Sequence, residues 1–469
     1  TSEGGTEPDT PEGETGPDTS GNLSDEDETG NSGDFGKEET PDASQEPSDD
    51  TDTEETEGEN PAQPGVESPE EQPMEEMPGS VSANDRNVEV MAEEGQSVGK
   101  AVNSGKVNDI IWKIEEGTLT IEGTGDYGDG NIAPPWADRE DVTSVIVKVT
   151  GITSTEHMFS GCSSLTDVDL AGLDTSRVTD MSGMFSRCKS LRGLDLSGFD
   201  TSCVTNMEGM FGGCRSLGEL DLSGFDTSLV TNMSGMFCVG GYESGVDDSG
   251  TVKPIWRNGC LSDLDISHFN MENVTDTSWM FAGCGRNIKL GHFNSVNVTN
   301  MNMMFYSTSI LNMDAENFDT RSVTDMGGMF SECQNLTTLD VSCFDTSKVE
   351  NMSSMFSYCD KLEDLDLSCF DTSRVENMSS MFYYCGRLKD LDLTGFDTRN
   401  TENMRKMFSG CNSLKRLDLS SFDMGYCTGD PMDIWELEKM EYICTPVNCL
   451  IRERLPDQAG KWYTEDGTE

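Results

Sequence analysis

Apolar and polar positions along the chain repeat with a period of about 26 residues. A Met-Phe pair occurs ten times, and successive pairs lie 26, 26, 26, 44, 24, 25, 26, 26 and 26 residues apart. The phenylalanines of these pairs are Phe159, Phe185, Phe211, Phe237, Phe281, Phe305, Phe330, Phe356, Phe382 and Phe408. A fixed period in this range is typical of a solenoid, in which each coil buries its apolar face against its neighbours. The pattern therefore predicts a β-rich repeat solenoid of about ten 24–26-residue coils over 153–424.

Within one repeat, the apolar residues predict the sides of a coil. Leu191, Leu194 and Leu196 have the L-x-x-L-x-L spacing of leucine-rich repeats. A short strand is expected over 194–197, because its alternation points Leu194 and Leu196 inward and Asp195 outward. The other inward positions of this repeat are Phe199, Val204, Met207, Met210, Phe211 and Cys214.

Both ends of the repeat region carry strand patterns that predict capping units. Residues 110–114, 118–122 and 145–149 are strand-like, with a turn at Glu116-Gly117, so 87–152 is expected to form a small N-terminal β cap. A last strand-like stretch ends at Ile443, and 425–455 is expected to form the C-terminal cap. Residues 456–469 are expected to begin a following segment. The start at Thr1, without methionine, indicates a processed or cropped product.

The longest interval between Met-Phe pairs indicates an insertion at about 239–258. Insertions in solenoids form loops on one face, which is often the binding face, although a neutral insertion remains an alternative. Aromatic residues gather in and near this insertion. They are predicted as loop contacts with a ligand: Tyr242, Trp256 and Trp279. Binding of a carbohydrate would predict exposed aromatic rings clustered on one face.

Charge divides the chain into two unequal parts. The net charge is −57, and residues 1–90 hold 29 Asp or Glu against Lys37 and Arg86. The Pro/Glu/Thr-rich segment 1–86 has too few large apolar residues to form a core, so a disordered acidic tail or stalk is expected. Its use is either as a spacer or as a docking tail for a basic partner. Because both parts repel phosphate, nucleic acid is not an expected partner. The sequence contains no run of 18 apolar residues, so no membrane-spanning helix is predicted.

The consensus repeat is Leu-Asp-Leu-Ser-x-Phe-Asp-Thr-Ser-x-Val-x-Asn-Met-Ser-x-Met-Phe-x-x-Cys. It resembles the BspA-type leucine-rich repeat of bacterial surface proteins, in the variant shared with mycoplasma-type lipoproteins. The resemblance implies a secreted or cell-wall-displayed bacterial protein. It also implies an adhesin, because characterised members bind host matrix proteins, promote coaggregation and engage innate immune receptors. It brings no catalytic residue to this chain.

One outward position of the repeat is an aspartate in nine of the ten coils, with Lys289 as the exception. These residues are predicted as an acidic binding face: Asp169, Asp195, Asp221, Asp265, Asp314, Asp340, Asp366, Asp392 and Asp418. Stacked at roughly 4.8 Å, the carboxylates repel one another. They are therefore expected to have raised pKa values, to be neutralised in part by basic neighbours such as Lys415, or to bind cations. Loosely bound Ca²⁺ is a candidate guest, while attraction of a basic patch on a protein partner is the favoured use.

Eight cysteines occupy the Met-Phe-x-x-Cys position, which predicts a buried thiol in eight of the ten coils. A ladder of parallel thiols does not supply the four converging ligands of a zinc site. Disulfides are instead considered for two pairs, Cys343 with Cys369 and Cys444 with Cys449. The Asn or Asp that precedes the first Met of each repeat is expected to form a side-chain ladder that satisfies backbone groups at the bend.

No nucleophile elbow, metalloprotease helix or phosphate loop occurs in the chain, so we predict neither an enzyme nor a cofactor. The favoured interpretation is a non-enzymatic surface binding module or adhesin. Its solenoid strand face would recognise a host extracellular-matrix protein or another bacterial surface protein. The alternative is a structural spacer that presents another domain beyond the C-terminus of this fragment.

Overall fold

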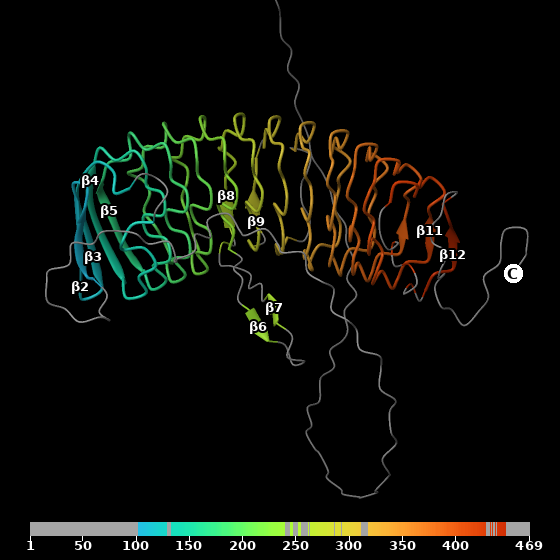
Figure 1. Cartoon of the computed structure of the whole chain (residues 1–469), viewed down its shortest axis with the longest axis horizontal. Helices are drawn as coiled ribbons and strands as arrows, with labels where there is room; N and C mark the ends of the chain where they lie inside the picture. The colour runs from blue at the N-terminus through green and yellow to red at the C-terminus, as the bar shows by residue number, and fades with distance from the viewer. Residues whose placement is uncertain are drawn as a thin grey trace, which may run out of the picture. The chain divides into compact units, whose positions relative to one another are not determined.

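The structure is a computed structural model. It describes residues 102–446 except 129–132, 240–243, 247–251, 255–260, 262, 286, 292, 311–317, 428–431, 433, 435, 436 and 438. These residues form a solenoid whose coils stack side by side from β5 to β12 (Figure 1). No α-helix occurs among them. The strands are β1 Ser104–Val107, β2 Ile110–Glu115, β3 Thr118–Thr124, β4 Ser144–Thr150, β5 Asp167–Leu173, β6 Ser244–Val246, β7 Val252–Pro254, β8 Asp263–Asp265, β9 Asn287–Lys289, β10 Asp390–Leu391, β11 Arg416–Asp418 and β12 Tyr442–Cys444.

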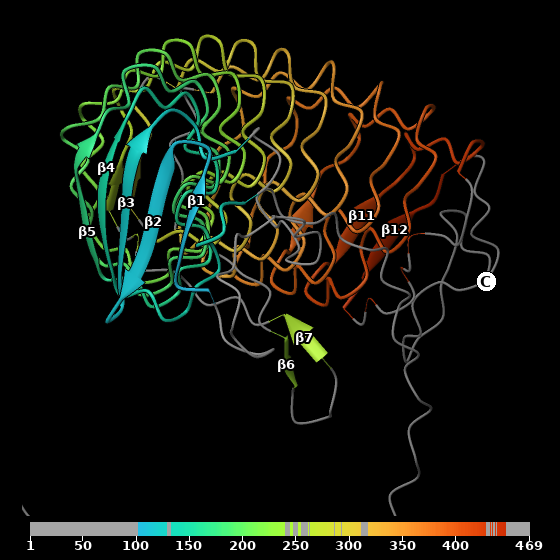
Figure 2. The ribbon, with the colours of Figure 1, turned by 60° about the vertical axis from the view of Figure 1, so that its left-hand side comes forward.

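The N-terminal strands form one five-stranded sheet in the order β1-β2-β3-β4-β5 (Figure 2). The predicted strands at 110–114, 118–122 and 145–149 are confirmed, while β1 was not predicted. β1, β2 and β3 pair antiparallel, and β3, β4 and β5 pair parallel. Because β5 lies in the first repeat and Thr118 pairs with Ser144, one coil length further on, the cap continues directly into the coils.

The core of the solenoid is a stack of phenylalanine rings. All ten Met-Phe phenylalanines are buried, and neighbouring ring centres lie 5.4–6.0 Å apart. The rings of Phe237 and Phe281 keep this spacing, at 6.0 Å, although the insertion separates them in sequence. The insertion therefore leaves the stack intact, and it carries the antiparallel pair β6 and β7.

The predicted Asn/Asp ladder is confirmed and is the most continuous element of the fold. Parallel bridges join one position of every coil from Ser154 to Asn403. Each side-chain Oδ1 accepts the backbone N–H two residues on, as from Ser353 to Asn351 at 3.0 Å. Each aspartate of the ladder is followed in the next coil by an asparagine, whose amide donates back to it in the pairs Asp180–Asn206, Asp276–Asn300 and Asp325–Asn351. Two carboxylates never stack directly, which avoids repulsion in this half-buried row.

The Leu-x-Leu strands are less regular than predicted. The strand expected over 194–197 is wrong, because this stretch has no strand pairing, whereas β8, β10 and β11 form at the equivalent place in other coils. Backbone pairing is therefore concentrated at the Asn/Asp ladder. A last strand is present at the predicted end of the repeats, as β12.

A left-handed backbone position recurs immediately before the conserved cysteine. Glycine occupies it in some coils, with φ of 74° at Gly213 and 80° at Gly410, while Tyr384 occupies it with φ of 58°. A Cβ added to Gly410 would meet the Tyr384 backbone and ring at 2.9–3.0 Å. The large side chain of Tyr384 in one coil thus occupies the space beside Gly410 in the next coil. This contact between coils cannot be predicted from a single repeat.

The conserved cysteines are buried and donate their thiols between coils. Cys359 Sγ donates to the Phe330 carbonyl at 3.1 Å, and the same bond recurs at 3.0–3.2 Å for Cys188, Cys214, Cys284, Cys333, Cys385 and Cys411. Burial raises the pKa of Cys214, Cys333 and Cys411 to about 12, so these thiols stay protonated. The prediction of a buried weak donor is confirmed.

The proposed disulfides have a different outcome. Cys343 and Cys369 are not joined, and Cys369 Sγ donates instead to the Val341 carbonyl at 3.2 Å. For the second pair, Cys449 lies outside the described residues, while Cys444 ends β12.

Candidate binding surface

The predicted acidic face is present as a row of aspartates, which we call the aspartate column. Its described members are Asp169, Asp195, Asp221, Asp265, Asp340, Asp366, Asp392 and Asp418. Asp314 lies outside the described residues. All of the described members are exposed except Asp418, which is half-buried. A second acidic row lies two residues upstream on the same face and is also exposed: Asp167, Glu219, Asp263, Asp364 and Asp390.

Each member of the aspartate column caps a turn. Its Oδ1 accepts the backbone N–H of the residue two positions on, at 2.9–3.1 Å in all eight described coils. Hydroxyls add a second bond at Ser197, Ser267 and Thr394, at 2.6–2.7 Å. This is the local Asx arrangement that a short polar side chain makes with its own backbone. One carboxylate oxygen is therefore committed to the fold.

The expected rise in the pKa values of the column is wrong. Hydrogen bonds from the turn lower the pKa of Asp195, Asp221, Asp340, Asp366, Asp392 and Asp418, and that of Asp265 falls to about 2. These donors touch each carboxylate directly, whereas repulsion between coils acts through solvent. These seven carboxylates are consequently ionised at neutral pH and present a row of negative charges.

A lysine forms an ion pair with one described member of the column. Lys289, which replaces the aspartate in its own coil, pairs with Asp265 Oδ2 at 3.2 Å. Lys415, another of the basic neighbours expected to neutralise the column in part, pairs instead with Glu441 at 3.0 Å. Within the described ranges, no group of three or more His, Cys, Asp or Glu residues is arranged to hold a metal ion.

The aromatic residues predicted as insertion contacts do not form an exposed cluster in the described structure. Trp279 is buried, with 6% of its surface exposed, and packs against Tyr306 at a ring distance of 5.5 Å. Cys238 and Ala282 complete this small apolar cluster. Tyr242 and Trp256 lie outside the described residues. Trp279 thus stabilises the coils beside the insertion and offers no ring face to a ligand.

Comparison with protein families decides the affiliation of these coils. The model of the family described as "Mycoplasma protein of unknown function, DUF285" matches residues 148–241, 256–339 and 330–429, which together make up more than half of the chain. The chain belongs to this family. The matched segments are the stacked coils, in agreement with the mycoplasma-type BspA-like repeat that the consensus resembles. None of the curated proteins matches the chain.

Two solved structures are similar to this DUF285 chain. A leucine-rich repeat protein from Bacteroides ovatus ATCC 8483 is 16% identical, with 73% of this chain and 88% of that chain covered and a TM-score of 0.34. A leucine rich cell surface protein from Faecalibacterium prausnitzii A2-165 is 15% identical, with 75% and 96% covered and a TM-score of 0.31. In the part of the DUF285 chain that the structure describes, no helix is long and apolar enough to cross a membrane.

At its C-terminal end the strand face of these DUF285 coils contains a groove that the sequence patterns did not predict. The groove has a volume of about 320 Å³ and is lined by Asp390, Leu391, Asp392, Thr394, Arg416, Asp418 and Tyr442. The Arg416 guanidinium lies over the Tyr442 ring at 4.8 Å. Alignment of the repeats could have indicated this groove, because Asp390, Arg416 and Tyr442 occupy one position in successive coils. The acidic row therefore ends in a cation and an aromatic ring.

The lowered pKa of Asp265 predicts a specific loss of stability in acid. A carboxyl whose pKa is below its ordinary 3.8 when folded adds stability that is present above pH 3.8 and is lost as the pH falls toward about 2. Asp265→Asn keeps the Oδ1 acceptor but removes the charge. We expect the variant to be less stable than the parent protein at pH 6, with the difference disappearing near pH 2, as measured by urea denaturation. A difference that does not change with pH would contradict this account.

Proposed function

We propose that this protein is a non-enzymatic bacterial binding module, secreted or displayed on the cell surface, that recognises a protein partner through the strand face. The aspartate column is the observation that carries the proposal. The carboxylates of Asp340, Asp366 and Asp392 are ionised, exposed and repeated from coil to coil, so the face presents an extended negative potential. A partner with a basic patch gains favourable encounter rates and a fixed register on such a surface. The resemblance to BspA-like adhesins supports a host extracellular-matrix protein or another bacterial surface protein as that partner.

The matched test removes charge from this face without removing the turn caps. In the triple variant Asp340→Asn, Asp366→Asn, Asp392→Asn, each new amide oxygen still accepts the N–H that the carboxylate accepted. The control is Asp345→Asn, Asp371→Asn, Asp397→Asn, because these aspartates make the same kind of cap one corner further on in the same coils. Both variants lose three charges.

Binding of the whole protein to a panel of host matrix proteins is measured at two salt concentrations, with and without calcium. We expect saturable binding that weakens at high salt. The strand-face variant should lose about tenfold or more in affinity, while the control should lose little. Equal losses in the two variants would show that only total charge matters. An absence of binding by the folded protein to any panel member would overturn the proposal in favour of a structural spacer. Loss of binding on calcium removal would show that binding requires Ca²⁺.

A further inference from the structure

The last coils depart from the earlier ones at one exposed position. In six preceding coils the residue before the ladder Asn/Asp is a threonine, whose hydroxyl donates to a carbonyl of the previous coil at 3.1–3.4 Å: Thr179, Thr205, Thr231, Thr275, Thr299 and Thr324. In the next three coils the position holds Glu350, Glu376 and Glu402. An ionised carboxylate cannot donate that bond. The backbone bond between these positions is kept, at 2.8 Å both for Thr231 N to Thr205 O and for Glu376 N to Glu350 O. The glutamate coils therefore lose only the side-chain bond.

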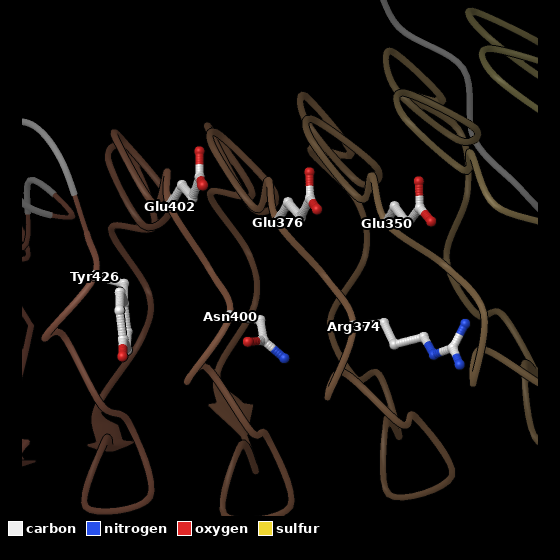
Figure 3. Close-up of a pocket in the computed structure, with 6 residues that line it drawn as sticks. All are labelled: Glu350, Arg374, Glu376, Asn400, Glu402 and Tyr426. Carbon is white, nitrogen blue, oxygen red and sulfur yellow. The ribbon is translucent and has the colours of Figure 1, made fainter.

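The glutamates form one wall of a groove, and a second row of side chains forms the other. Arg374, Asn400 and Tyr426 occupy another repeat position, one in each coil, and run parallel to the glutamates (Figure 3). The groove has a volume of about 320 Å³ and crosses three coils. It shares no residue with the groove at the end of the aspartate column. We call it the lateral groove.

The lining of the lateral groove combines planar polar groups with one exposed aromatic ring. Tyr426 is 69% exposed, the largest value for a large hydrophobic residue in the described part of the chain. Asn400 uses its amide nitrogen to hold the Ser373 carbonyl at 2.6 Å, and the lining glutamates and Arg374 make no ion pair with a described residue. The carboxylates supply acceptors, the guanidinium supplies donors, and the tyrosine supplies a ring with an apolar face and a polar end.

We propose that the lateral groove binds an extended, uncharged polysaccharide chain that runs along the coil axis. Hydroxyl groups on a sugar donate to carboxylates and accept from guanidinium, while the apolar face of a sugar ring packs on an exposed tyrosine. Rows that repeat once per coil suit a polymer that itself repeats. The three carboxylates disfavour polyanionic glycans.

An extended peptide fits this groove less well than a glycan. Peptides bind along a surface either by adding a strand to a free edge or by placing apolar side chains in pockets. The backbone N–H groups of Glu350, Glu376 and Glu402 are already bonded between coils at 2.8 Å, so no free edge is offered. The lining contains no aliphatic side chain, so it offers no apolar pocket for the side chains of a peptide.

The test measures binding of hexasaccharides by the whole protein, using calorimetry with β-1,4-linked glucose and β-1,4-linked N-acetylglucosamine oligomers. Two variants remove the two parts of the site. Tyr426→Ala removes the ring. Glu350→Thr, Glu376→Thr, Glu402→Thr restores the residue of the earlier coils, whose fold accommodates it. We expect binding by the parent protein and a loss of about tenfold or more in each variant.

Two further variants distinguish glycan binding in the lateral groove from attraction by charge and from binding at the strand face. Glu376→Gln keeps an acceptor and should weaken hexasaccharide binding only a few-fold, whereas a ligand held by charge would be lost. The aspartate-column variant should bind hexasaccharides as the parent protein does. The proposal for the lateral groove and the proposal for the strand face are therefore tested separately. The inference is overturned if neither hexasaccharide binds. It is equally overturned if a lysine-rich peptide binds here in their place and is released by Glu376→Gln.

Discussion

Replacing Phe356 by alanine is expected to lower the free energy of unfolding by about 3–5 kcal/mol. The Phe356 ring is fully buried between the rings of Phe330 and Phe382, at 6.0 and 5.9 Å. Alanine leaves a cavity in the middle of a stack whose backbone is held by the Asn/Asp ladder, so the neighbouring coils cannot close the gap. Because coils of a solenoid contact only their neighbours, the damage also weakens coupling between the two halves of the stack.

Urea denaturation followed by circular dichroism measures this effect. We expect a lower midpoint and a broader or two-step transition, since a weakened interface allows the halves to unfold separately. Phe356→Leu is the matched control, because it keeps most of the apolar volume and should lose much less stability. A single sharp transition at the parent midpoint for the alanine variant would contradict the ring stack as the main source of stability.

Replacing Asn351 by leucine is expected to lower the free energy of unfolding by about 2–3 kcal/mol. Asn351 accepts the Ser353 N–H at 3.0 Å and donates to Asp325 Oδ1 at 3.0 Å. Leucine has a similar size but leaves both partners in a half-buried row without these bonds. The control is Asn351→Ser, because Ser154 begins the same ladder and its hydroxyl accepts the Glu156 N–H at 3.2 Å.

Thermal and urea unfolding of the Asn351 variants measure the contribution of the ladder. Serine should retain the turn cap but not the amide donor, and should therefore be intermediate between leucine and the parent protein. If leucine and serine were equally stable, the cap at Ser353 would contribute nothing, and backbone pairing alone would hold the coils together at this position.

The sequence by itself determined the features that depend on one repeat. The period of the repeat determined the length of each coil. The spacing of Leu, Phe, Met and Cys determined which side chains point inward, because burial in a coil follows local geometry. The same holds for the Asn/Asp ladder, whose caps reach only two residues along the chain. The consensus also resembled the family to which the chain was then shown to belong.

Contacts between coils were decided only by the tertiary structure. The pKa of the aspartate column depended on whether turn donors or repulsion between coils acted more strongly, and the turn donors were closer. The burial of Trp279 and the match of Tyr384 to Gly410 each involve residues in two coils. The two rows of the lateral groove run side by side across three coils. A repeat pattern specifies which positions stack, whereas the distances and hydrogen bonds across the stack arise only when the coils are assembled.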